Sequence, residues 1–93
     1  MVRYKARECY IHRKMADDDF LIPVGRQIIK NNGIVLLNET AAFLWNEIQT
    51  EKTADELCKA LSEEYELECE DVADDVMQFI NDMLSLDAIE RIE

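Results

Sequence analysis

The sequence predicts a small α+β domain in which a three-stranded antiparallel β-meander is followed by three α-helices. Three observations support this prediction. The first third of the chain contains short apolar runs separated by turn residues, which is the pattern of strands. The remainder contains three segments with apolar residues at helical spacing. A chain of 93 residues suffices for one core, so we expect residues 1–93 to form a single domain.

The first two strands are predicted over residues 9–15 and 20–24, with a run of three aspartates between them. Apolar and polar residues alternate along CYIHRKM, the first of these segments. Pro23 has no N–H to donate to a neighbouring strand, so its nitrogen should face no partner. Gly25 should allow a bend or bulge, after which the strand is expected to resume through residues 26–30.

The third strand is predicted over residues 34–37, where the sequence reads IVLL. Asn32 and Gly33 suit a tight type I′ turn before it, because both residues tolerate positive φ. A surface strand normally alternates apolar and polar residues, whereas this one is apolar on both faces. Two explanations remain open. Either both faces are buried, one under the helices and one under the N-terminal residues, or a free edge accepts a strand from another chain.

Three helices are predicted in the rest of the chain. Asn38, or alternatively Thr40, is the expected N-cap of the first helix. Thr53 and Glu56 form a capping box at the start of the second. The third begins near Glu70 and has an apolar arc wider than one packing face needs, comprising Val72, Ala73, Val76, Met77, Phe79, Ile80, Met83 and Leu84. The order of elements is winged-helix-like, and the final AIERIE suits a short extended tail.

Charge is distributed unevenly along the chain. Residues 1–37 carry a net charge of +3 and residues 38–93 a net charge of −14, which sum to −11. An acidic half repels phosphate and anionic lipid, and the third helix has no Arg or Lys with which to contact DNA. No apolar run approaches the roughly 20 residues that span a bilayer. The N-terminus does not resemble a secretion signal. We therefore expect a cytoplasmic protein that binds neither nucleic acid nor membrane.

The sequence lacks the motifs of enzymes and metal sites. It has one histidine, His12, and three widely spaced cysteines, Cys9, Cys58 and Cys69, without a CxxC pair. It contains no GxSxG, HExxH, P-loop or GxGxxG motif. We therefore expect a protein that is not an enzyme, with no catalytic residue, no cofactor and no metal. The helical spacing of Cys58 predicts a core residue.

Four segments resemble the PqqD family: FLIPVG, NNGIVLLNETAAFLWNEI, TADELCKALSEEY and EDVADDVMQFINDML. The most specific piece is LNETAAFLW, in which a strand ending in Leu-Asn leads through small residues to a Trp. The resemblance spans residues 20–86 and is weakest at the N-terminal strand. It implies three strands, three helices and the role of a precursor-peptide recognition element. Such an adaptor, or chaperone, binds the leader of a ribosomally made peptide and presents its core to a modifying enzyme, often a radical S-adenosylmethionine (SAM) enzyme.

The resemblance also implies where the leader docks, namely as an added strand against the third strand and beside the third helix. The implied peptide-binding residues are Ile34, Val35, Leu36 and Leu37 on the strand, with Asp74, Met77, Gln78, Asn81 and Leu84 on the helix. Val76 and Ile80 belong either to this groove or to the core. The sequence leaves open which face of the helix lines the groove, and whether Val35 or Leu36 directs its N–H outward. The acids on the helix favour a guest with Lys or Arg.

Two other functions remain open at this point. One is a DNA-binding regulatory domain, which the winged-helix-like order suggests. The other is a protein–protein interaction domain that uses its acidic helix and keeps its strand edge covered. A free edge also permits a homodimer through pairing with a second copy. The sequence does not identify the precursor peptide, the enzyme or the final product.

Overall fold

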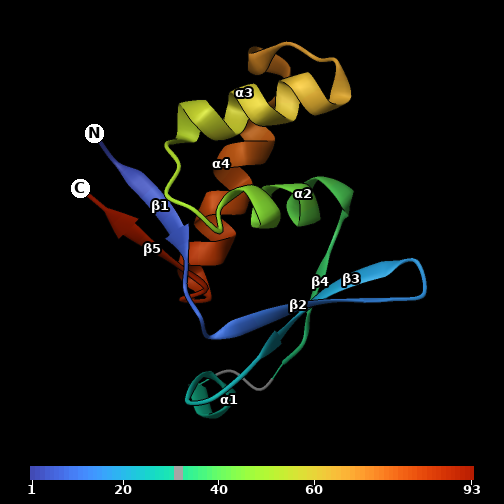
Figure 1. The fold of residues 1–93 in the computed structure, drawn as a ribbon, viewed down its shortest axis with the longest axis vertical. Coiled ribbons are helices and arrows are strands. Elements are labelled where there is room, and N and C mark those ends of the chain that lie inside the picture. Colours follow the sequence, from blue (N-terminus) through green and yellow to red (C-terminus); the bar gives the residue numbers. More distant parts are fainter. Residues whose placement is uncertain (31–32) are drawn as a thin grey trace.

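A three-stranded antiparallel sheet stands against a cluster of three helices (Figure 1). The computed structural model describes residues 1–30 and 33–93. The elements in chain order are β1 (Arg3–Ala6), β2 (Tyr10–Met15), β3 (Asp18–Pro23), α1 (Gln27–Lys30), β4 (Val35–Leu37), α2 (Glu39–Glu47), α3 (Ala54–Tyr65), α4 (Cys69–Ser85) and β5 (Ile89–Ile92). The predicted α+β class and the antiparallel order β2-β3-β4 are confirmed. The winged-helix arrangement is met only roughly, because a second pair of strands is present.

The second pair joins the two ends of the chain. β1 and β5 are antiparallel, with Arg3 opposite Ile92. Tyr4 also exchanges two backbone hydrogen bonds with Lys52, at 2.8 and 2.9 Å. The sequence predicts no strand before residue 9 and only an extended tail at the end. A pairing between the two ends of the chain has no local signature, because each strand is short and is fixed by its distant partner.

The chain after β3 also differs from the prediction, which continued the strand through residues 26–30. Gly25 instead adopts a φ of +60°, which most residues avoid, and the chain turns there into α1. The buried Gln27 holds α1 in place. Its side-chain amide donates to the Leu86 carbonyl at 2.9 Å and to the Tyr10 hydroxyl at 3.3 Å.

The turn predicted at Asn32-Gly33 lies partly outside the described residues. α1 stands between β3 and β4, so the connection between these two strands is longer than a tight hairpin loop. The register of the two strands is nevertheless regular, with Asp19 opposite Leu37 and Leu21 opposite Val35.

The helix starts follow the predicted capping residues. The Asn38 side chain accepts a hydrogen bond from the Ala41 N–H at 2.8 Å, which confirms the N-cap of α2. At α3 the Thr53 hydroxyl accepts from the Glu56 N–H at 3.1 Å, and the Glu56 carboxylate accepts from the Thr53 N–H at 2.9 Å. This confirms the capping box.

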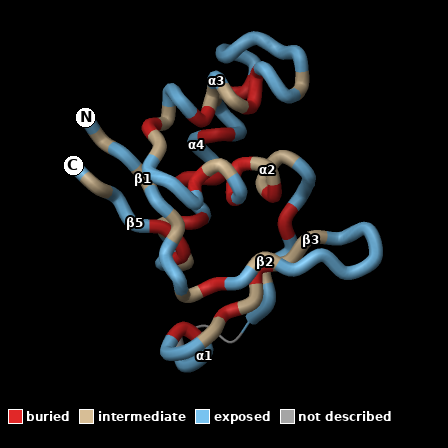
Figure 2. Tube along the Cα trace, in the orientation of Figure 1, coloured by how far each residue is buried: buried red, intermediate tan, exposed pale blue. Residues whose placement is uncertain are grey.

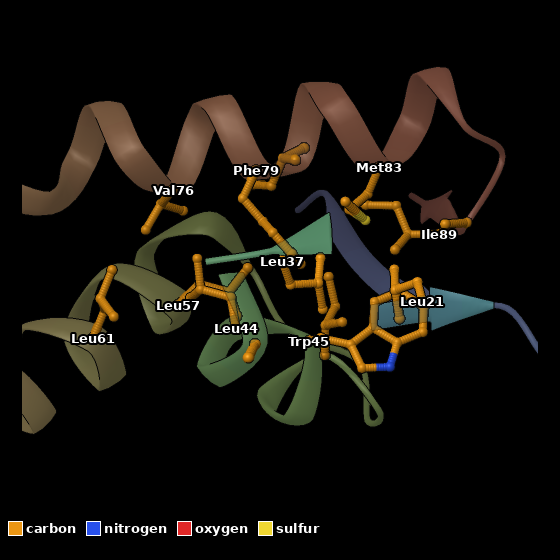
Figure 3. Close-up of a cluster of buried hydrophobic side chains, with 14 of the residues drawn as sticks. Leu21, Leu37, Leu44, Trp45, Leu57, Leu61, Val76, Phe79, Met83 and Ile89 are labelled. Carbon is orange, nitrogen blue, oxygen red and sulfur yellow. The ribbon is translucent and has the colours of Figure 1, made fainter. Parts of the chain in front are cut away.

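One core lies where α2, α3 and α4 meet the inner face of the sheet, whereas the tip of the β2–β3 hairpin is exposed (Figure 2). Figure 3 shows side chains from the sheet, all three helices and β5 in this cluster. Val76 and Ile80, which the sequence assigned either to the groove or to the core, are fully buried core residues. Cys58 packs against the core and is partly exposed.

Candidate functional site

Among the strands that the structure describes, β4 has a neighbour on one side only. The sheet order β2-β3-β4 places it at the edge, paired with β3. In the described parts of the chain, no strand pairs with its other edge. An edge of this kind presents unpaired backbone groups, so the direction of each N–H along β4 decides what the edge can bind.

The hydrogen bonds between β2 and β3 fix these directions. The Val24 N–H donates to the Cys9 carbonyl at 2.9 Å. These two residues directly follow and precede the pair Tyr10–Pro23 in the antiparallel register. Cys9 and Val24 are therefore a hydrogen-bonded pair and Tyr10 and Pro23 a non-bonded one. This assignment agrees with the missing N–H of Pro23.

Residues of a central strand point their N–H and C=O groups alternately at the two neighbouring strands. The backbone groups of Val24 point toward β2, so by this alternation those of Phe20 also point toward β2 and those of Leu21 point toward β4. Leu21 lies opposite Val35, so Val35 points toward β3. Leu36 lies opposite Phe20, and its N–H and C=O therefore point away from the sheet. Neither group of Leu36 forms another hydrogen bond within the described residues.

The side chains of β4 divide between two different environments. Leu37 is buried against the helices and Val35 is half-buried on the same face. Leu36 is 63% exposed on the opposite face, and the preceding Ile34 is 59% exposed. The explanation in which both faces of IVLL are buried is therefore wrong. The strand is apolar on both sides, yet the described residues cover only its inner face.

A groove of about 460 Å³ runs between β4, the start of α2 and the second half of α4. Its lining residues are Val35, Leu36, Leu37, Asn38, Thr40, Ala41, Leu44, Asp75, Gln78, Phe79, Asp82, Met83, Ser85 and Leu86. Figure 3 shows Phe79 of α4 directed toward Leu37 of β4. Phe79 and Met83 are each only 4% exposed, so the groove has a firm apolar floor.

The groove contains four of the nine residues that the resemblance implied for peptide binding. Val35, Leu36, Leu37 and Gln78 line it. The other five do not belong to the lining: Ile34, Asp74, Met77, Asn81 and Leu84. Of these five, Ile34 directly precedes β4 and the rest lie on other faces of α4.

The choice of helix face explains this difference. The predicted groove face extended the core stripe of α4 toward its apolar flank, which contains Met77 and Leu84. The structure turns the opposite flank toward β4, and this flank is polar, with Asp75, Gln78 and Asp82 at spacings of three and four residues. The sequence left the choice of flank open, and the residues named from the resemblance included the apolar flank, which does not line this groove. Only the placement of α4 beside β4 in the folded chain shows which side faces the groove.

Two carboxylates stand along the α4 side of the groove. The Asp82 carboxylate accepts a hydrogen bond from the Gln78 side-chain amide at 2.9 Å. Neither Asp75 nor Asp82 forms an ion pair with a described residue, and the lining contains no Lys, Arg or His. The groove therefore combines an apolar floor, negative charge on one wall and free backbone groups on the other.

The described residues offer little other chemistry. They contain no cluster of three or more side chains able to hold a metal ion. The His12 side chain is hydrogen-bonded to the Asp19 carboxylate, with 2.8 Å between Nε2 and Oδ1. Burial raises the pKa of the Cys58 thiol above its ordinary value of 9.0, which keeps the sulfur protonated and weakly nucleophilic at neutral pH. Among these residues, no helix has the length and apolar character required to cross a membrane.

Comparison with known proteins gives one match. The family model described as coenzyme PQQ synthesis protein D (PqqD) matches residues 21–89, which is most of the chain and includes β4, the groove and all three long helices. This match confirms the resemblance found in the sequence. No curated protein and no solved structure matches the chain.

Proposed function

The chain belongs to the PqqD family, described as coenzyme PQQ synthesis protein D, and we propose that it is a non-enzymatic adaptor for a precursor peptide. In this proposal, an extended leader segment adds to β4 as a fourth strand of the sheet. The bound precursor is then presented to a modifying enzyme, for which the family resemblance suggests a radical SAM enzyme. Association with coenzyme PQQ synthesis is the general context that family membership provides.

The direction of the Leu36 backbone carries this proposal. Its N–H and C=O point out of the sheet and form no bond within the described chain. A guest strand bonds to both groups at once, as in other cases of β-augmentation. By the same alternation the groups of Ile34 point outward, which extends the ladder by one further pair. Each such hydrogen bond contributes a net ~1 kcal/mol.

The groove supports the proposal by providing room for guest side chains. A residue of an added strand that lies opposite Val35 projects to the same side as Val35, over the apolar floor of Phe79 and Met83, and its neighbours project beside Leu36. Each apolar side chain buried there contributes about 1.5–3 kcal/mol before the cost of ordering the peptide. Backbone pairing and two or three such side chains are consistent with micromolar to nanomolar affinity, about −8 to −12 kcal/mol.

An adaptor of this kind increases the rate of modification without chemistry of its own. Holding the leader next to an enzyme raises the effective concentration of the core peptide, to the millimolar range for short flexible linkers. The composition of α4 disfavours the alternative of a DNA-binding helix, because α4 carries five Asp and Glu residues after its first position and no Lys or Arg.

Selection from a random decapeptide library displayed on phage tests this function, because it requires no candidate leader sequence. We expect enriched peptides that protect the Leu36 amide from hydrogen exchange, measured by NMR on the labelled protein. Protection should not extend to the outward backbone groups of β2. Failure to enrich any sequence, or enriched peptides that leave the Leu36 amide unprotected, would contradict strand addition at β4.

A further inference from the structure

We infer that the groove selects an extended peptide with two basic residues at positions i and i+4, and with three apolar residues between them. This inference rests on the proposed function and specifies the ligand of the same site. Its physical basis is the placement of two carboxylates, neither of which forms an ion pair with a described residue, along one wall of a groove with an apolar floor. The occupant is thus a cationic peptide segment, and not a second copy of this acidic chain.

The two carboxylates are available to a guest. Asp75 and Asp82 are both exposed and both line the groove. No described Lys, Arg or His side chain forms an ion pair with either of them. The Gln78 amide donates to Asp82 but carries no charge, so this hydrogen bond orients the carboxylate without neutralising it. A Lys or Arg of the guest could therefore form an ion pair with either carboxylate without displacing a described side chain that is already paired with it.

The spacing of the carboxylates sets the spacing of the basic residues. Asp75 and Asp82 are seven residues apart on α4, which at 1.5 Å per residue is about 10.5 Å along the helix axis. Residues on one face of a strand recur every two positions, at roughly 6.7 Å, and every four positions, at roughly 13 Å. Two basic residues four positions apart can each reach one carboxylate, because their long, flexible side chains need only lean slightly toward each other. Two positions would crowd them over Gln78.

The positions between the basic residues are expected to be apolar for two different reasons. The middle groove-facing residue lies over the floor formed by Phe79 and Met83, where a charge would be desolvated without a partner. The two residues on the other face lie beside the exposed side chains of Ile34 and Leu36, with which apolar cross-strand pairs are favourable. This accounts for a strand that is apolar on both faces, because the guest continues both surfaces.

The phage-display decapeptides provide the test. We expect enriched sequences to carry Lys or Arg at positions four apart, with apolar residues between. Replacing both basic residues by Gln in a synthetic copy should weaken binding about two- to tenfold, as for two partly exposed ion pairs. The protein variant with Asp75→Asn and Asp82→Asn should bind the basic and Gln peptides equally. Fluorescence anisotropy measures all four affinities.

A second variant separates the local carboxylates from the general negative charge of the protein. Glu63→Gln with Asp74→Asn removes the same net charge from exposed positions outside the groove. This variant should keep the preference for the basic peptide. Equal loss of preference in both variants would assign the effect to overall charge and overturn the inference. Enriched peptides that protect the Leu36 amide but lack paired basic residues would overturn it too, while leaving the proposed function intact.

Discussion

At the scale of single residues, Leu36 differs from its neighbours in the direction of its backbone. Val35 and Leu37 lie opposite Leu21 and Asp19 and bond to β3, whereas Leu36 turns both of its polar groups outward. Three consecutive apolar residues thus have two distinct roles, which their chemical similarity does not reveal. The alternation of antiparallel hydrogen bonds decides between them.

Proline substitutions in β4 test this difference. Leu36→Pro removes an N–H that points away from the sheet, so the free energy of unfolding should change by less than about 1 kcal/mol. Binding of a library-selected decapeptide should weaken at least tenfold, because β4 loses the N–H that donates to a carbonyl of the peptide and because the proline ring obstructs pairing at this position. Denaturant unfolding and fluorescence anisotropy measure the two effects.

Val35→Pro is the matched control, one position away in the same strand. It removes an N–H that bonds to β3 and should lower the free energy of unfolding by about 1–3 kcal/mol. If the two substitutions destabilise the protein equally, the backbone direction assigned to Leu36 is incorrect.

At the scale of elements, the capping box fixes where α3 begins and gives this helix a dependence on pH. The Thr53 N–H donates to the Glu56 carboxylate, and this bond lowers the pKa of Glu56 below its ordinary value of 4.5. A lowered pKa means that the folded state favours the ionised carboxylate. The stabilisation is therefore present above pH 4.5 and is lost as the pH falls through the pKa of the folded protein.

Glu56→Gln tests this assignment. A glutamine keeps a hydrogen-bond acceptor but does not titrate, so the melting temperature of the variant should fall less steeply than that of the wild type below pH 4.5. Circular dichroism melts between about pH 3 and pH 7 measure this difference. Thr53→Ala, which removes the other half of the box, should cost about 1 kcal/mol at neutral pH. Parallel pH profiles for wild type and Glu56→Gln would contradict this role of Glu56.

At the scale of the whole molecule, β1 and β5 close the fold on the side away from the groove (Figure 1). β1 and the residue after it bond to three separate parts of the chain besides β5. The Ala6 N–H donates to the Ile48 carbonyl at 2.8 Å and the Arg7 N–H to the Ala88 carbonyl at 2.9 Å, and Tyr4 pairs with Lys52. This strand lies outside the matched family region, yet it ties the start of α3 to the end of α4.

Deletion of residues 1–7 should therefore reduce stability without removing the groove. We expect a loss of roughly 2–4 kcal/mol in the free energy of unfolding, since several backbone hydrogen bonds worth about 1 kcal/mol each disappear. Affinity for a library-selected decapeptide should stay within about twofold at a temperature where the shortened chain remains folded. A much larger loss of affinity would show that β1 contributes to the site.

The charge of the whole molecule gives a prediction about nucleic acid. A protein with a net charge of −11 and no basic residue on α4 should release few counterions from DNA. An electrophoretic shift titration in low salt should therefore show no complex with duplex DNA. A shifted band that weakens as salt is added would revive the DNA-binding alternative.

The sequence by itself determined the features that depend on neighbouring residues. The caps at Asn38 and Thr53, the helical core stripes and the apolar strand predicted over residues 34–37 all have local signatures, and the family resemblance rests on the same segments. Tertiary structure alone decided which face of α4 is directed toward β4 and which amide of β4 points outward. It also decided that the two ends of the chain pair as β1 and β5. These features depend on contacts between residues far apart in the chain. Periodicity gives the faces of a helix or strand but does not say which neighbour each face will meet.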